Sequence, residues 1–244
     1  MNQKNNSLAI ILAAGKGTRM NSKIPKPIVK VNNYPIISWL INDFKNNATD
    51  IAIIINPLDG LFFNDYKKSA KLVYQKSPKG TGHAVQQALN LIKKYKYTYV
   101  FVGDCPFVGI ENIRLMYNRH NVNNNDLTIL SGIFKDKTFP YARIIRDDNQ
   151  SIINCIEEID ATYKQKKIKE LFGSHYLFKS SILLNYLDNL NPNSKTGEVY
   201  FTDIINDLIY DNKKVDSLIV NDWRRIVGLN TKKELEWIES QKMI

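Results

Sequence analysis

Hydrophobic positions along the first half of the chain alternate between two patterns. Mostly apolar runs, typical of buried parallel strands, occupy residues 8–14, 50–56, 71–75 and 97–102. Apolar side chains at helical spacing occupy residues 36–44 and 83–94. This alternation of strands and helices predicts an α/β fold, doubly wound around a mainly parallel, Rossmann-like sheet.

The pattern changes beyond about residue 126. Short, closely spaced strand candidates lie at residues 128–130, 142–145 and 152–156. Helical spacing returns at residues 182–190, 201–210 and 232–238. The polar stretch 118–126 is predicted to be a surface loop, and no long linker or internal repeat divides the chain. We therefore expect one domain with a mixed second half.

The segment after the first predicted strand combines glycine with positive charge. It reads Gly15-Lys16-Gly17-Thr18-Arg19-Met20, and Pro25-Lys26-Pro27 follows shortly. A Walker loop needs Gly-Lys-Ser/Thr after a longer spacer, and a dinucleotide fingerprint needs a third glycine where Met20 stands. Backbone N–H groups and three cations, Lys16, Arg19 and Lys26, remain, which is enough charge for a triphosphate.

A second motif joins Gln75 to the segment Gly80-Thr81-Gly82-His83-Ala84, after one predicted strand and before a helix. Glycine lets a backbone approach a planar base, and an amide side chain offers both a donor and an acceptor to a pyrimidine edge. As a bare pattern the segment is equally an ordinary turn and helix start. Its place after the phosphate loop favours base recognition.

Gly103-Asp104 closes the predicted strand 97–102. A carboxylate at that position lies in the crevice where open α/β sheets bind ligands, and it is a natural Mg²⁺ ligand. The alternative is a turn-forming aspartate. The order of the three motifs favours the metal site.

Composition narrows the class of protein. The 244 residues are 43% hydrophobic and 24% charged, without an 18-residue apolar run or a signal-peptide pattern, so we expect a cytoplasmic protein with no membrane partner. Neither the two cysteines nor the three histidines have metal-site spacing. The net charge of +10 comes mainly from dispersed lysines, which indicates solvated surface rather than a nucleic-acid partner.

The stretch Leu12–Met20 with Pro25-Lys26 resembles the signature of sugar-1-phosphate nucleotidylyltransferases, most closely that of N-acetylglucosamine-1-phosphate uridylyltransferases, within the MobA-like NTP transferases. The resemblance implies the nucleotide-diphospho-sugar transferase fold in one domain, 1–244. It divides this domain into an NTP-binding half, 1–125, an acceptor-binding half, 126–230, and a C-terminal helix, 231–244.

The resemblance also implies roles for individual residues. The catalytic residues are Arg19, Lys26 and Asp104, and Mg²⁺ is held by Asp104 and Asn230. The nucleotide-binding residues are Leu12, Ala13, Ala14, Gly15, Lys16, Gln75, Gly80 and Thr81. The acceptor-binding residues are Ala142, Glu157, Glu198, Tyr200 and Thr202. From the residues alone, Asn230 is equally a candidate helix N-cap.

Two positions depart from the family pattern. Tyr141-Ala142 stands where Tyr-Gly is usual, and Phe172-Gly173-Ser174 stands where Asn-Thr-Gly is usual. Loss of an amide that pairs with the acceptor changes specificity strongly, because a polar partner is left without its hydrogen bond. We therefore expect the two departures to affect which sugar the protein accepts more than the nucleotidyl transfer itself.

The resemblance implies transfer of UMP from UTP to a sugar 1-phosphate, N-acetylglucosamine 1-phosphate in the first place, with release of pyrophosphate. The product is a nucleotide sugar of the kind used for cell-envelope polysaccharide. Three alternatives remain open: a cytidylyltransferase that uses CTP and another small phosphorylated acceptor, a molybdenum-cofactor type guanylyltransferase, and a non-catalytic nucleotide- or nucleic-acid-binding protein. No hexapeptide repeat is present, so acetyl transfer is not expected, and the oligomeric state is left open.

Overall fold

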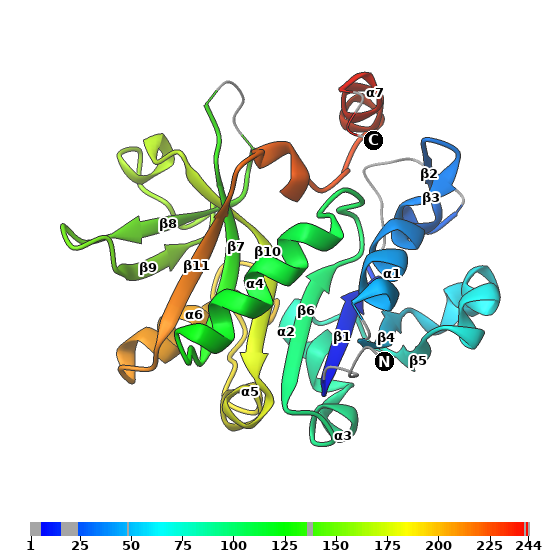
Figure 1. Ribbon diagram of the computed structural model, residues 1–244, viewed down its shortest axis with the longest axis horizontal. Coiled ribbons are helices and arrows are strands. Elements are labelled where there is room, and N and C mark those ends of the chain that lie inside the picture. Colours follow the sequence, from blue (N-terminus) through cyan, green and yellow to red (C-terminus); the bar gives the residue numbers. More distant parts are fainter. Residues whose placement is uncertain (1–5, 16–23, 48, 136–138, 242, 244) are drawn as a thin grey trace.

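The chain folds around a single mixed sheet. The computed structural model describes residues 6–15, 24–47, 49–135, 139–241 and 243. Within them, nine strands form the main sheet, whose central path runs β11-β7-β10-β6-β1-β4-β5 (Figure 1). Along this path β10 is antiparallel to both neighbours, and the other four pairings are parallel. The predicted α/β fold with a mainly parallel sheet is confirmed.

The strands of the main sheet are β1 Ser7–Leu12, β4 Asp50–Ile55, β5 Lys71–Tyr74, β6 Tyr97–Val102, β7 Leu127–Ile133, β8 Ala142–Arg146, β9 Ile152–Ile156, β10 Glu170–Lys179 and β11 Val215–Val220. A small separate hairpin pairs β2 Lys30–Val31 with β3 Tyr34–Pro35. The α-helices are α1 Ile36–Asn46, α2 Thr81–Gln86, α3 Leu89–Ile92, α4 Ile110–Val122, α5 Ser180–Leu187, α6 Asp203–Tyr210 and α7 Lys232–Ser240. The 3₁₀ segments are η2 Lys26–Ile28, η3 Pro57–Lys68, η4 Gln165–Lys167 and η5 Trp223–Ile226.

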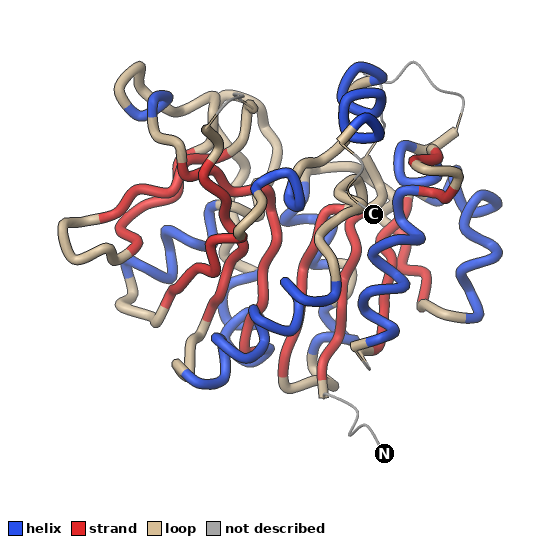
Figure 2. The backbone as a smooth tube through the Cα atoms, turned by 45° about the horizontal axis from the view of Figure 1, so that its top comes forward, coloured by secondary structure: helices blue, strands red, loops and turns tan. Residues whose placement is uncertain are grey.

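Helices cover both faces of the sheet, as Figure 2 shows, because strand side chains alternate in direction. In β1, Leu8 and Ile10 join one core with α2, α3, α5 and α6. Ala9 and Ile11 join the other core with α1 and α4. The uncharged run recognised in the sequence is thus a strand buried on both faces, as expected of a parallel sheet between helical layers.

The ends of four strands bring the predicted motifs to one edge of the sheet. Because β1, β4, β5 and β6 are parallel, the segments that follow them emerge on the same side. Gly103 approaches β1 so closely that its N–H donates to the Leu12 carbonyl at 2.8 Å, and a Cβ at Gly103 would lie 2.8 Å from the same oxygen. The first and third motifs therefore lie side by side.

Several boundaries predicted from the sequence are wrong. The expected loop 118–126 begins inside α4, because Ile113, Met116 and His120 form a buried stripe on that helix while its polar residues face outward. The helix expected over 83–94 is interrupted after Gln86 and resumes at Leu89. The helix expected from residue 201 begins at Asp203. Strands β10 and β11 and the 3₁₀ segment η3 were not predicted.

None of the helices in the described ranges is long and apolar enough to cross a membrane.

The imidazole of His175 on β10 is fully buried, and within the described chain neither ring nitrogen has a hydrogen-bond partner. Burial lowers its pKa from 6.5 to about 4, with a smaller opposing effect of the Asp104 charge. Between pH 6.5 and pH 4 this histidine is protonated in the unfolded chain but stays neutral in the folded chain. The unfolding free energy therefore falls as the pH falls through that interval. We expect this group to remove at most about 2 kcal/mol of unfolding free energy between pH 7 and 5.

Urea unfolding of the wild type and of His175→Leu at pH 8, 7, 6 and 5 measures the effect. The difference at pH 8, where the imidazole is neutral in both states, isolates the change in packing. The variant is expected to lose less stability than the wild type below pH 6.5. Parallel pH profiles for the two proteins would contradict the prediction.

Candidate active site

A cavity of about 490 Å³ opens at the carboxyl edge of the parallel strands. Ten of its lining residues belong to the predicted site: Leu12, Ala13, Ala14, Gly15, Lys26, Gln75, Gly80, Thr81, Asp104 and Glu198. The other described lining residues are Pro27, Pro78, Ala84 and Val102, which lie within the predicted motifs or no more than two residues from them. The structure thus gathers all three sequence motifs around one concave site.

Lys26, Asp104 and Asn230 form the polar cluster of this site. The Lys26 ammonium makes an ion pair with the Asp104 carboxylate and donates to Asn230 Oδ1 at 2.8 Å. The side chains of Lys26 and Asp104 are only 17% and 18% exposed. Two oxygens separated by 126 residues in sequence therefore converge on a single positive charge.

Asn230 reaches this position because it does not cap the following helix. Thr231 is the N-cap of α7: its hydroxyl accepts from the Glu234 N–H at 3.1 Å, and Glu234 accepts in return from the Thr231 N–H at 2.8 Å. This capping box satisfies the helix start. The alternative N-cap role of Asn230 is therefore wrong, and its side-chain oxygen is directed to Lys26 instead.

Tyr141 and Gly228 hold the segment that carries Asn230 against Asp104. The Gly228 N–H donates to Tyr141 Oη at 2.9 Å, and the Leu229 N–H donates to the Asp104 carbonyl at 2.9 Å. Gly228 packs so tightly that a Cβ there would lie 2.8 Å from Asp104 Oδ1. Burial raises the pKa of Tyr141 well above its usual range, so the hydroxyl keeps its proton. Nothing in the local sequence predicted that Tyr141 would contact Gly228.

We expect Tyr141→Phe to lower the unfolding free energy by about 1–3 kcal/mol and to reduce turnover, because the buried Gly228 N–H loses its acceptor beside Asp104. Urea unfolding and a pyrophosphate-release assay measure the two effects. Tyr210→Phe removes a hydroxyl from a side chain that is 86% exposed and serves as the matched control. If Tyr141→Phe were as stable and as active as Tyr210→Phe, the Tyr141 hydroxyl would not be needed to position Gly228 beside Asp104.

The Gln75 side chain is 3% exposed and is fixed by two contacts. Its Nε2 donates to the Gly80 carbonyl at 3.1 Å and lies 3.0 Å from His83 Nδ1. Among the described residues, the Gly80 N–H has no hydrogen-bond partner. An amide oxygen and a backbone N–H from Gln75 and Gly80 are therefore left for a ligand in the cavity.

Gly80 requires glycine for two reasons. Its φ of +104° lies in the left-handed region, and a Cβ there would lie 2.5 Å from the Val199 carbonyl oxygen. The Val199 N–H donates to the Lys79 carbonyl, and the Phe201 N–H donates to the Thr81 hydroxyl at 3.0 Å. These contacts bring Glu198 to the cavity, and they show that the Thr81 hydroxyl is already an acceptor within the fold.

Glu157, Thr202 and Asp203 form a second polar cluster. Burial raises the pKa of Glu157, and the negative charge of Asp160 raises it further. A hydrogen bond with the Thr202 side chain lowers the pKa and partly offsets these effects. The pKa of Asp203 rises to about 6, mainly through burial and then through the charges of Glu157 and other nearby carboxylates. Such carboxylates favour a partner that donates hydrogen bonds, as sugar hydroxyls do.

Of the predicted acceptor residues, Glu198 is among the described residues that line the cavity, whereas Ala142, Glu157, Tyr200 and Thr202 are not. Ala142 is 3% exposed and is paired in register with Phe172 across β8 and β10, so the two departures from the family pattern are direct neighbours. Phe172 precedes an irregularity in the β10 pairing and is fully buried. Tyr200 lies in the same short segment as Glu198 and Thr202, two residues from each. Lys16 and Arg19 lie outside the described residues.

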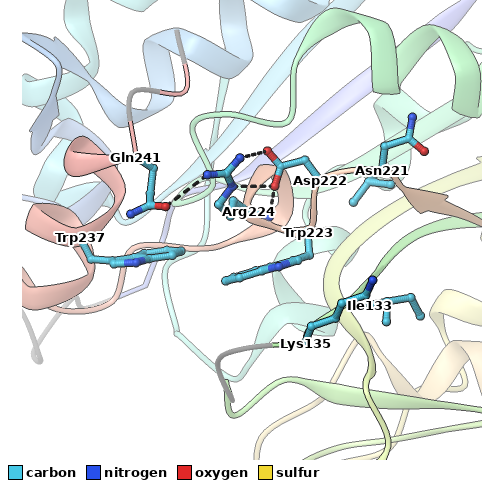
Figure 3. Close-up of a pocket in the computed structure, with 9 residues that line it drawn as sticks. Ile133, Lys135, Asn221, Asp222, Trp223, Arg224, Trp237 and Gln241 are labelled. Atoms are coloured by element: carbon cyan, nitrogen blue, oxygen red, sulfur yellow. Dashed lines mark hydrogen bonds and ion pairs between the residues drawn. The ribbon is translucent and has the colours of Figure 1, made fainter.

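A larger cavity, of about 770 Å³, lies between η5 and α7 (Figure 3). Trp223 and Trp237 stack there with ring centroids 5.7 Å apart. The lining residue Asp222 accepts two hydrogen bonds of 2.8 Å from the Arg224 guanidinium, and Arg224 also donates to Gln241. Among the described residues that line this cavity, none belongs to the predicted site, and the one carboxylate, that of Asp222, is engaged by an arginine.

Residues 9–177 match the model of the MobA-like NTP transferase domain, and the chain belongs to this family. The protein is thus an NTP transferase enzyme. It is 34% identical over 232 residues to the bifunctional protein GlmU of Thermosipho melanesiensis and 33% identical over 224 residues to that of Acholeplasma laidlawii. These alignments cover 95% and 91% of this chain. The chain spans about half the length of these relatives, 50% and 48%.

Proposed function

We propose that the protein transfers UMP from UTP to a sugar 1-phosphate, N-acetylglucosamine 1-phosphate in the first place, and releases pyrophosphate. The observation that carries the choice of nucleotide is the fixed amide of Gln75. Both of its N–H groups face acceptors of the protein, Gly80 and His83, so the side chain offers only its oxygen to a base. Gly80, whose N–H has no hydrogen-bond partner within the described part of the chain, lines the same cavity and supplies a donor.

Uracil complements this pair of groups. Its N3–H donates to an acceptor such as the Gln75 oxygen, and the neighbouring ring carbonyl accepts from a donor such as the Gly80 N–H. Cytosine presents an unprotonated N3 and an amino group at those two positions, which would set acceptor against acceptor and donor against donor. A site whose buried polar groups are left unpaired rejects a ligand strongly. The geometry therefore favours UTP over CTP.

The polar cluster fits a magnesium ion. Asp104 and Asn230 supply the hard oxygen ligands that Mg²⁺ prefers, and both reach the same cation, the Lys26 ammonium. Within the described ranges no group of three or more potential metal-ligating side chains of the His, Cys, Asp or Glu type is assembled. A site with two protein oxygens suits an ion that also takes substrate phosphates and water as ligands. When bound, such an ion neutralises phosphate charge during phosphoryl-type transfer.

In the proposed reaction no side chain of the protein forms a covalent bond with the substrates. An oxygen of the acceptor phosphate attacks the α-phosphorus of UTP, the new P–O bond forms, and the bond to the β-phosphate oxygen breaks, so that pyrophosphate leaves with the electron pair. Lys26 moves from its ion pair to the α-phosphate, where it stabilises charge in the transition state. Lys16 and Arg19 hold the β- and γ-phosphates. Catalysis then rests on positioning and electrostatics.

Glu157 and Thr202 bind the acceptor through its hydroxyl groups. We expect Glu157→Gln to raise the acceptor KM by about tenfold while the nucleotide KM stays within about threefold of wild type, because only one charged hydrogen bond to the sugar is weakened. Steady-state kinetics with each substrate varied in turn measure both constants. An equal rise in both KM values would place Glu157 elsewhere than at the acceptor.

Mg²⁺-dependent pyrophosphate release tests the proposal as a whole. UTP, CTP, GTP and ATP are each combined with a panel of sugar 1-phosphates and other small phosphorylated acceptors. Turnover of UTP with N-acetylglucosamine 1-phosphate supports it. Turnover of UTP only with another sugar 1-phosphate would show that Ala142 and Phe172 reshape the acceptor site. Turnover of CTP alone, or of no nucleotide, refutes it.

A further inference from the structure

His83 touches the base-reading side chain without lining the cavity. Its Nδ1 lies 3.0 Å from Gln75 Nε2, and its ring lies in a separate hollow with Tyr74, Lys76 and Gln87. His83 is half-buried and is the third residue of α2. Any effect of His83 on a bound nucleotide is therefore exerted through Gln75.

The hydrogen-bonding pattern determines the tautomer of His83. A carbonyl only accepts, so the Gln75 atom 3.1 Å from the Gly80 oxygen is the amide nitrogen. That nitrogen carries two hydrogens; one is donated to Gly80 and the other to the imidazole. Nδ1 must then be the unprotonated acceptor, and the proton of the neutral ring resides on Nε2. The Gln87 amide nitrogen lies 3.3 Å from Nε2, but it donates to the His83 carbonyl at 3.0 Å and makes no hydrogen bond to the protonated Nε2. With both N–H groups used, Gln75 meets the base with oxygen alone.

We propose that His83 is a positioning residue that fixes the Gln75 amide with its oxygen available to the base, and that this contact makes the site select uracil over cytosine. The inference rests on the proposed function. Without an acceptor at the His83 Nδ1 position, a half-turn rotation of the Gln75 amide breaks only its hydrogen bond to the Gly80 carbonyl. The rotated amide presents an N–H to the base, which suits the unprotonated N3 of cytosine.

A matched pair of variants tests the proposal. His83→Leu keeps bulk but removes the acceptor, whereas His83→Asn offers a side-chain oxygen close to the position of Nδ1. The readout is the ratio of kcat/KM for UTP to that for CTP in pyrophosphate release. We expect the ratio to fall about tenfold in the leucine variant, mainly through the UTP KM, and to stay within about threefold of wild type in the asparagine variant.

An unchanged ratio in His83→Leu overturns the proposal, as does an equal fall in both variants, which would indicate a packing role. A wild-type protein that uses neither UTP nor CTP refutes the proposed function instead. The tautomer is tested without any change of fold by ¹⁵N NMR of the histidine-labelled protein at pH 8, with the His83 signal assigned by its absence in His83→Asn. A protonated Nε2 and unprotonated Nδ1 support the inference, and a protonated Nδ1 overturns it.

Discussion

Asp104→Asn is expected to reduce kcat/KM by about 10²–10³ at saturating Mg²⁺, because the charge that attracts the metal is lost while the shape of the side chain is kept. Asp104 follows β6, lines the cavity and pairs with Lys26 in a mostly buried position. Pyrophosphate release over a range of Mg²⁺ concentrations measures the loss. The apparent affinity for Mg²⁺ is expected to fall together with the rate.

Asp148→Asn makes the same chemical change at an exposed turn and serves as the control, with activity expected to remain at the wild-type level. Circular dichroism establishes that both variants are folded. Near-normal activity of Asp104→Asn at saturating Mg²⁺ would exclude Asp104 as a metal ligand. The converging oxygens of Asp104 and Asn230 would then serve only to hold Lys26.

Lys26→Met is expected to reduce kcat by about 10²–10³, since a preorganised charge that stabilises a transition state commonly contributes this much. The structure adds a second expected effect. Because Lys26 occupies the position between Asp104 and Asn230, its removal frees both oxygens. In the absence of nucleotide, the variant is therefore expected to bind Mn²⁺ more tightly than the wild type, while catalysis is lost.

Electron paramagnetic resonance of free Mn²⁺ measures binding, and the pyrophosphate assay measures rate. Lys30→Met, at an exposed position of β2, is the matched control and is expected to change neither. Weaker Mn²⁺ binding in Lys26→Met would contradict a competition between the ammonium and the metal. An unchanged rate would remove Lys26 from the catalytic residues.

Much of the nucleotide side of the fold and site was predictable from local sequence. A strand buried on both faces must be a nearly continuous apolar run, so β1, β4 and β6 were evident. The residues that follow such strands must emerge at one sheet edge, so Asp104 and Gln75 were expected near the phosphate loop. The family match over residues 9–177 confirms the class of enzyme that these motifs indicated.

The acceptor half was less predictable, because its strands do not follow a simple period. β10 carries Gly173, a positive φ at Ser174 and a fully buried His175, and it is inserted antiparallel between β7 and β6. Polar residues in a buried strand weaken the apolar signal, and β11 is equally interrupted by Asp216 and Ser217. The helix α4 was missed because three buried positions on one face are outnumbered by polar residues on the other.

The sequence by itself determined the class of fold and the three motifs that meet at one edge of the sheet, because each depends on the chemistry of a short segment. Only the tertiary structure decided that Asn230 meets Lys26 rather than capping α7, that Tyr141 holds Gly228 beside Asp104, and that His83 orients Gln75. Two of these contacts join residues 204 and 87 positions apart, and the third depends on which amide atom faces Gly80. Such pairings follow from the packing of the whole chain and leave no local pattern in the sequence.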